Sequence, residues 1–147
     1  MDNHRIIAFA SAVILISLGM LACHSISTPT KAMQTYWYAM KNKDIKAWKS
    51  IFPKQRREWR EKIAKERNKS PDDLYKEDLD SDYSDVSGMP VKLETRNETI
   101  SSDGKTATLE VKNPKYDRWV TARFVKEDDG WKLIDSGLAF HSAAGYD

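Results

Sequence analysis

Cysteine, histidine and glycine are scarce in this chain of 147 residues, and each shortage excludes a class of chemistry. The single cysteine, Cys23, leaves no partner for an internal disulfide, so packing alone must stabilise the fold. The histidines at positions 4, 24 and 141 have no spacing typical of a metal site, so we expect neither a metal nor another cofactor. The six glycines form no GxGxxG or GxxxxGK motif, and no pattern typical of a Ser-His-Asp triad is present.

The longest apolar run is too short for an ordinary transmembrane helix. Residues 6–22 carry no charge, yet these 17 residues fall short of the ~20 that span a bilayer. The run follows a polar start ending in Arg5 and is followed by Ala22-Cys23. This pattern resembles the lipobox of bacterial lipoprotein precursors, in which a small residue precedes an obligatory cysteine. The alternative is an uncleaved anchor helix, because 17 apolar residues nearly span a thin bilayer.

The lipobox resemblance implies a processed, exported protein. It predicts a signal peptide over 1–22 and a lipid, with fatty acyl chains such as palmitate, on Cys23. The mature protein would then be anchored to the cell envelope, at the outer membrane in a Gram-negative cell, because His24 is not the Asp that resembles an inner-membrane retention signal.

Charge is nearly balanced overall, at +2, but it is unevenly distributed along the chain. Residues 41–69 hold 12 Lys or Arg against 4 Asp or Glu, whereas residues 72–85 hold 7 acids against one Lys. The basic block is typical of a solvated helix face. It could also contact anionic lipid headgroups or an acidic wall polymer, or be neutralised by the acidic stretch folding back. The membrane-facing candidates are Arg56, Arg57 and Arg60.

Nucleic acid is not an expected partner of the basic block. Export removes the usual nucleic-acid partners, and the aromatic residues Trp48 and Trp59 fall on predicted core faces.

Apolar spacing predicts two or three helices in the first half of the mature chain. Thr28-Pro29 is typical of a helix start, and an apolar stripe at helical spacing predicts a helix over 29–41. Asp44 is expected to cap a short second helix that ends at Pro53. Residues 54–68 favour a solvated helix, and Ser70 is typical of another helix start. We expect residues 78–88, which are acidic and rich in small side chains, to form a mobile loop.

The periodicity changes from near 3.6 to 2 after Pro90 and predicts four strands. Short turns separate them, so neighbouring strands should pair antiparallel. The inward residues predicted for the four strands are Val91, Leu93 and Thr95; Ala107, Leu109 and Val111; Val120, Ala122 and Phe124; and Trp131, Leu133 and Asp135. The predicted fold class is α+β, with N-terminal helices packed on a four-stranded antiparallel sheet.

The mature part resembles small bacterial lipoproteins of unknown function with a nuclear-transport-factor-like, cystatin-like domain. The resemblance rests on the helix opening at 29–33, on Lys43-Asp44 followed by Trp48, and on the segment 124–133. It implies a curved sheet that closes on the first helix to form a cone. The expected domains are a lipidated tether at 23–28, the domain proper at 29–140 with a charged insert at 54–88, and a tail at 141–147.

Such a cone could hold a pocket, although an aromatic and Met stripe at helical spacing also forms an ordinary core. The pocket-lining candidates are Tyr36, Trp37, Met40, Ala122, Phe124 and Trp131. Enzymes of this fold class include isomerases and dehydratases that pair a carboxylate base with a Tyr donor. Asp135 shares the parity of the inward residues of its strand and would face Tyr36, the alternative being a carboxylate in a turn.

The sequence therefore predicts a membrane-tethered, non-enzymatic binding or interaction module of the cell envelope, with its ligand open. The alternative is a small proton-transfer enzyme using Asp135 and Tyr36. A homodimer through the sheet face is a further expectation, with Trp119 and Val125 as candidate contacts.

Overall fold

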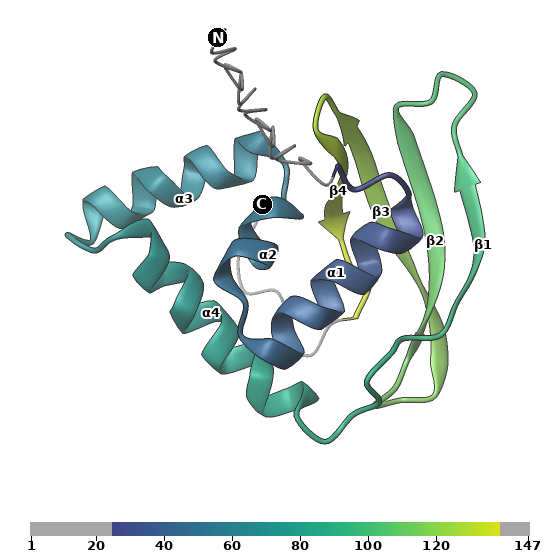
Figure 1. Cartoon of the computed structure of the whole chain (residues 1–147), viewed down its shortest axis with the longest axis horizontal. Helices are drawn as coiled ribbons and strands as arrows, with labels where there is room; N and C mark the ends of the chain where they lie inside the picture. Colours follow the sequence, from purple (N-terminus) through teal and green to yellow (C-terminus); the bar gives the residue numbers. More distant parts are fainter. Residues whose placement is uncertain (1–24, 139–147) are drawn as a thin grey trace, which may run out of the picture.

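Helices fill the first half of the described chain and strands fill the second. The computed structural model describes residues 25–138, and the elements within this range are α1 (Pro29–Asn42), α2 (Ile45–Ser50), α3 (Lys54–Glu66), α4 (Pro71–Val86), β1 (Thr95–Ile100), β2 (Thr106–Asn113), β3 (Arg118–Glu127) and β4 (Gly130–Asp135). The strands form one antiparallel meander in the order β1-β2-β3-β4. The predicted α+β class is confirmed. Figure 1 shows α1 lying across one face of the sheet, with α3 and α4 forming a V beyond α2.

Local capping explains where the helices begin. The Thr28 hydroxyl accepts a hydrogen bond from the Lys31 N–H at 3.0 Å, and Asp44 accepts one from the Ala47 N–H at 2.9 Å. α4 begins with a reciprocal capping box between Ser70 and Asp73. These three helix starts confirm the sequence-based expectations.

The prediction of a mobile loop over residues 78–88 is wrong, because α4 continues to Val86. Its buried residues Tyr75, Leu79 and Val86 fall at i, i+4 and i+11 and pack in the core cluster. The acidic side chains at 72, 73, 77 and 80 are exposed, whereas those at 78, 82 and 85 are half-buried beside or on this stripe. Tertiary packing of this narrow stripe therefore overrides a composition typical of a loop.

The second, third and fourth predicted strands are present, whereas the first is displaced. Residues 91–94 precede the sheet, and β1 begins at Thr95, which pairs with Val111. Leu93 is nevertheless buried. Of the other two residues predicted to face inward here, Thr95 is half-buried and Val91 is 88% exposed, so the inward prediction for Val91 is wrong.

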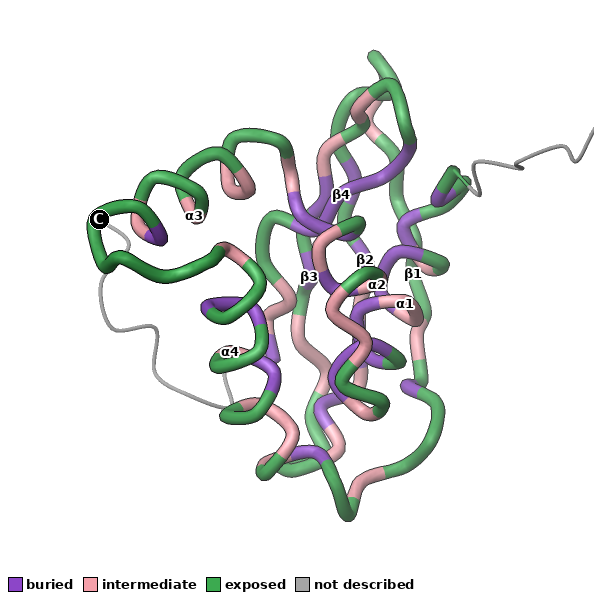
Figure 2. The backbone as a smooth tube through the Cα atoms, turned by 60° about the vertical axis from the view of Figure 1, so that its left-hand side comes forward, coloured by how far each residue is buried: buried purple, intermediate pink, exposed green. Residues whose placement is uncertain are grey.

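The core lies between α1 and the inner face of the sheet. Figure 2 shows buried positions along α1 and the central strands, while α3 is exposed along most of its length. Trp37 is fully buried, and its indole N–H donates to the Pro90 carbonyl at 3.0 Å. The largest fully buried apolar side chains are Trp37, Phe124, Met33, Met40, Ile51, Leu74, Leu79, Leu109, Leu133, Leu138 and Val86.

The outer edge of β4 forms backbone hydrogen bonds with two segments from the helical half of the chain. The Trp131 N–H donates to the Ile26 carbonyl at 2.9 Å, and the Leu133 N–H donates to the Ile51 carbonyl at 2.7 Å. The buried ammonium of Lys132 donates to the Ser50 carbonyl at 2.8 Å. Ile26, within the segment 23–28 expected to be the lipidated tether, is itself buried.

Three expectations fall on residues that are not described: the signal peptide over 1–22, lipid attachment at Cys23 and the tail at 141–147. Within 25–138, none of the helices has the length and apolar character needed to cross a membrane. The apolar run at 6–22 lies outside this range.

Candidate functional site

Three buried aromatic rings converge where α1 meets α2. Tyr36 on α1 stacks on Trp48 of α2 with ring centroids 5.1 Å apart. Phe52, just after α2, meets Trp48 edge-on at 5.0 Å and Tyr36 edge-on at 6.5 Å. Such offset and edge contacts add to the stability from area burial. The three rings form a rigid apolar surface.

These rings form the floor of a cleft of about 970 Å³. The first helices contribute the floor, α3 and α4 one side, and β3 with the end of β4 the other. The lining residues are Tyr36, Trp48, Phe52, Pro53, Gln55, Arg56, Trp59, Asp82, Arg123, Val125, Leu133, Ile134, Asp135 and Ser136. This volume lies within the range typical of small-molecule sites.

The two arginines of the cleft differ in their partners. Arg123 is paired with Asp135 at 3.1 Å. The Arg56 guanidinium lies 3.9 Å from the centroid of the Phe52 ring, and among residues 25–138 it forms no salt bridge. Arg56 therefore brings to the cleft a cation that pairs with no carboxylate of the described residues.

A further donor without a described partner lies beneath the surface of the floor. The indole Nε1–H of Trp48 is buried and has no hydrogen-bond acceptor in the described part of the chain. Trp48 itself is only 3% exposed. A buried donor without a partner costs about 1–3 kcal/mol, so the fold retains this group at a price in stability.

Tyr36 places a protonated hydroxyl in the same cleft. Burial raises the pKa of Tyr36 well above its ordinary value, and the nearby Asp82 carboxylate raises it further. A hydrogen bond with Ser136 and the charge of Arg56 oppose these effects on the pKa. At neutral pH the phenol thus remains neutral.

Asp135 does not point inward as the strand periodicity predicts. A β-bulge in β4, opposite Arg123 and Phe124 of β3, makes Leu133 pair with Phe124 but Asp135 with Arg123. The extra residue, Ile134, shifts the parity of the strand end to the other face. Asp135 is therefore exposed, and it accepts hydrogen bonds from Arg123 and from the Gly137 N–H at 2.9 Å.

Tyr36 and Asp135 nevertheless border the same cleft, whereas the other pocket-lining candidates are core residues. Trp37, Met40, Ala122 and Trp131 are buried in the hydrophobic core and do not line the cleft. Phe124 is also buried, and it borders a separate groove of about 370 Å³ across the strands.

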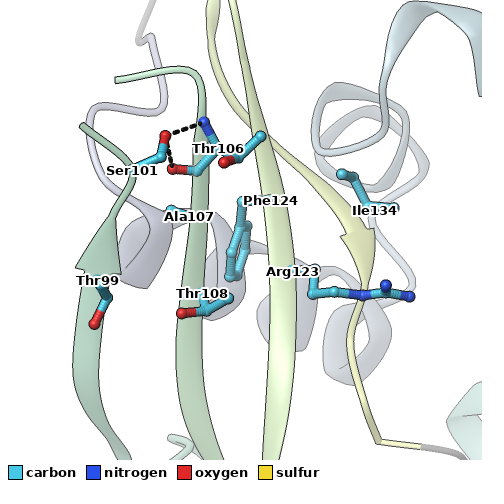
Figure 3. A pocket seen from close by; sticks show the side chains of 8 residues that line it. All are labelled: Thr99, Ser101, Thr106, Ala107, Thr108, Arg123, Phe124 and Ile134. Atoms are coloured by element: carbon cyan, nitrogen blue, oxygen red, sulfur yellow. Dashed lines mark hydrogen bonds between the residues drawn. The ribbon is translucent and has the colours of Figure 1, made fainter. Parts of the chain in front are cut away.

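The groove beside Phe124 is shallow and threonine-rich. Figure 3 shows its lining from β1 to β4, with Ser101 bonded to Thr106 across the first hairpin. Those hydrogen bonds, at 3.0 Å, close the hairpin turn, and the groove has less than half the volume of the aromatic-floored cleft. The aromatic-floored cleft is therefore the stronger candidate site.

The two residues expected to form homodimer contacts on the sheet face are both half-buried. Trp119 lies under the Arg96 guanidinium, 3.9 Å from the ring centroid, and Val125 lines the cleft.

The three membrane-facing candidates all contact the protein itself. Arg56 covers Phe52, Arg57 donates to the Phe52 carbonyl at 2.8 Å, and Arg60 is paired with Asp78. Other basic side chains also reach α4, in the pairs Lys43–Asp80, Lys49–Asp72 and Lys69–Glu77. Of the three readings of the basic block, the geometry favours internal neutralisation by the acidic helix. The expected core position of Trp59 is wrong, because its ring is 40% exposed at the cleft.

Sequence patterns identify some of these residues but not their convergence. Trp48 and Phe52 were visible as an apolar stripe, whereas Arg56, Trp59 and Arg123 carried no signal of a shared site. Among residues 25–138, no group of three or more His, Cys, Asp or Glu side chains is placed to hold a metal ion. Comparison of the chain with protein-family models, with curated proteins and with solved structures gives no match.

Proposed function

We propose that this chain is a membrane-tethered, non-enzymatic binding module of the cell envelope that holds a small ligand in the aromatic-floored cleft. One observation carries the binding function: a cleft of about 970 Å³ combines stacked aromatic rings with Arg56, which forms no salt bridge among residues 25–138. Ligand sites are typically apolar concavities with a few convergent polar groups.

The nuclear-transport-factor-like cone and the lipid anchor are parts of the same proposal. A helix packed across a four-stranded antiparallel meander supports the first. The uncharged run ending at Ala22-Cys23 supports the second. Ile26 is already paired with Gly130 at the β3–β4 turn. The three residues from Cys23 to Ile26 span at most about 10 Å, so this turn would lie close to the bilayer.

The binding function is tested by native mass spectrometry of the protein extracted from its own membranes. We expect a folded species whose mass exceeds that of the lipidated chain by a small molecule, which is lost on denaturation. The test variant is Trp48→Ala, which removes part of the cleft floor and should lose the bound mass. A bound mass that persists in this variant, or no bound mass and no binding of small apolar probes, would contradict the proposal.

The second candidate is a proton-transfer enzyme that uses Asp135 and Tyr36. The observation in its favour is that a tyrosine with a raised pKa borders the same cleft as a carboxylate. The exposed position of Asp135 and its pairing with Arg123 favour the binding module instead.

Deuterium incorporation separates the two candidates. The ligand recovered from the native protein would be incubated with the protein in D₂O and weighed again. A binding module leaves its mass unchanged, whereas proton transfer at carbon adds deuterium in the wild type and not in Asp135→Asn.

A further inference from the structure

We propose that the cleft ligand is an apolar organic molecule with a single negative charge, whose anionic group binds Arg56 and whose body lies on the aromatic floor. This inference rests on the proposed binding function and specifies its ligand class.

The charges of the cleft favour one negative charge rather than several. Its titratable charged side chains are Arg56, Asp82, Arg123 and Asp135. Arg123 is already neutralised by Asp135 at 3.1 Å, so Arg56 supplies the cation for a ligand. The carboxylate of Asp82 would repel a second negative charge, since like charges close together cost free energy in a partly desolvated site.

The position of Arg56 suits an anion. Its guanidinium lies 3.9 Å from the Phe52 centroid, and Arg56 is half-buried. A guanidinium covering a ring still has in-plane N–H donors at its edge, which match the two oxygens of a carboxylate or sulfonate. Partial burial strengthens such a charge-assisted bond relative to one in water.

The remaining surfaces suit a planar or branched apolar body. Trp59 is 40% exposed and Ile134 47% exposed at the cleft, although both are large apolar side chains. Half-buried Val125 adds to the same wall.

Two fluorescent probes with the same ring system test the charge. The anionic probe is 8-anilinonaphthalene-1-sulfonate, and its neutral counterpart is N-phenyl-1-naphthylamine. The chain would begin at His24, which keeps every helix, strand and core residue described above. Titrations would be run on the wild type, on Arg56→Gln and on Lys62→Gln, with circular dichroism melts for each.

The wild type should bind the anionic probe at least about tenfold more tightly than the neutral one, since a charge-assisted bond supplies the difference. Arg56→Gln should remove this preference and leave the affinity for the neutral probe unchanged. Lys62→Gln is the matched control, because it removes one positive charge from the same helix at a side chain that is 74% exposed. It should change neither affinity.

Two outcomes would overturn the inference, and they are distinguishable. Equal affinity for both probes, unaffected by Arg56→Gln, contradicts the anionic ligand but leaves the binding module standing. Failure of both probes to bind a folded wild type contradicts the proposed function itself.

Discussion

Gly130 joins the start of the fold to the last hairpin. Its φ is +120°, and a Cβ at this position would lie 2.6 Å from the Ile26 carbonyl oxygen. The backbone must approach this closely because Ile26 caps the edge of β4 through the Trp131 N–H. Any side chain here would therefore break the contact that closes the core.

We expect Gly130→Ala to lower the free energy of unfolding by at least about 2 kcal/mol, from φ strain and the clash with Ile26. Urea denaturation measures this loss. Gly88→Ala is the control, since nothing lies within 4 Å of its Cβ and its φ is not positive. A loss at position 130 no greater than that at position 88 would contradict the close approach.

Trp131 is the second residue on which the last strand depends. Its ring is 3% exposed and belongs to the core cluster. Trp131→Ala should cost about 3–5 kcal/mol, which is the range for emptying a buried aromatic site. Trp59→Ala, at a ring that is 40% exposed, should cost much less. Chemical denaturation that ranks the two variants in the opposite order would contradict this core assignment.

At the scale of elements, an ion pair joins α3 to α4. The side chains of Arg60 and Asp78 are 13% and 28% exposed, so the pair is more buried than the other links to α4. Breaking a partly buried pair leaves one charge uncompensated, which costs more than losing an exposed pair. The position of α3 beside the cleft thus depends on this contact.

We expect Arg60→Gln to cost about 1–3 kcal/mol at neutral pH, because it leaves the partly buried Asp78 carboxylate uncompensated. Asp78→Asn should cost a comparable amount, because it leaves the Arg60 guanidinium uncompensated at a side chain that is only 13% exposed. Thermal or urea unfolding measures both losses, and losses below about 0.5 kcal/mol in both variants would indicate that the pair contributes only as an ordinary surface bridge.

The contribution of the Arg60–Asp78 pair to the free energy of unfolding depends on pH. Burial raises the pKa of Asp78 above its ordinary value despite the opposing effect of Arg60, so the folded chain binds this proton more tightly than the unfolded chain. Protonation therefore adds stability as the pH falls through the raised pKa toward the ordinary Asp value of about 3.9. The loss in Arg60→Gln should accordingly shrink as the pH is lowered, and a loss that grows would contradict this sign.

At the scale of the whole molecule, the proposed lipid anchor has a direct test. Intact mass of membrane-extracted protein should show a chain that begins at Cys23 and carries a diacylglyceryl group. Cys23→Ser should leave the protein unprocessed or mislocalised on fractionation. An unmodified full-length mass would contradict the lipobox interpretation.

Internal charge pairing predicts how the lipid-free domain behaves at a membrane. Because α4 neutralises basic side chains of the preceding helices, the chain from His24 should co-sediment equally with neutral and anionic vesicles. Charge reversal at Arg56, Arg57 and Arg60 is a poor probe, since all three hold internal contacts. Reversal of the exposed Lys62 and Lys65 is the better one. A salt-sensitive preference for anionic vesicles that this reversal removes would instead assign α3 to the membrane surface.

The sequence by itself determined the features that local chemistry controls. Thr28, Asp44 and Ser70 start helices because each side chain accepts a hydrogen bond from a backbone N–H within the next turn. The parity of β2 follows from alternating apolar residues, which must all face the same core. These features involve groups a few residues apart, so their pattern is legible in the chain.

Only the tertiary structure decided the site. The bulge at Ile134 turns Asp135 outward because β4 must stay paired with β3 while the chain leaves the sheet. Arg56 reaches Phe52 from the next helix, and β3 supplies Arg123 and Val125 to the same cleft from far along the chain. These contacts depend on how the elements pack against one another, and no spacing within a single element records that packing.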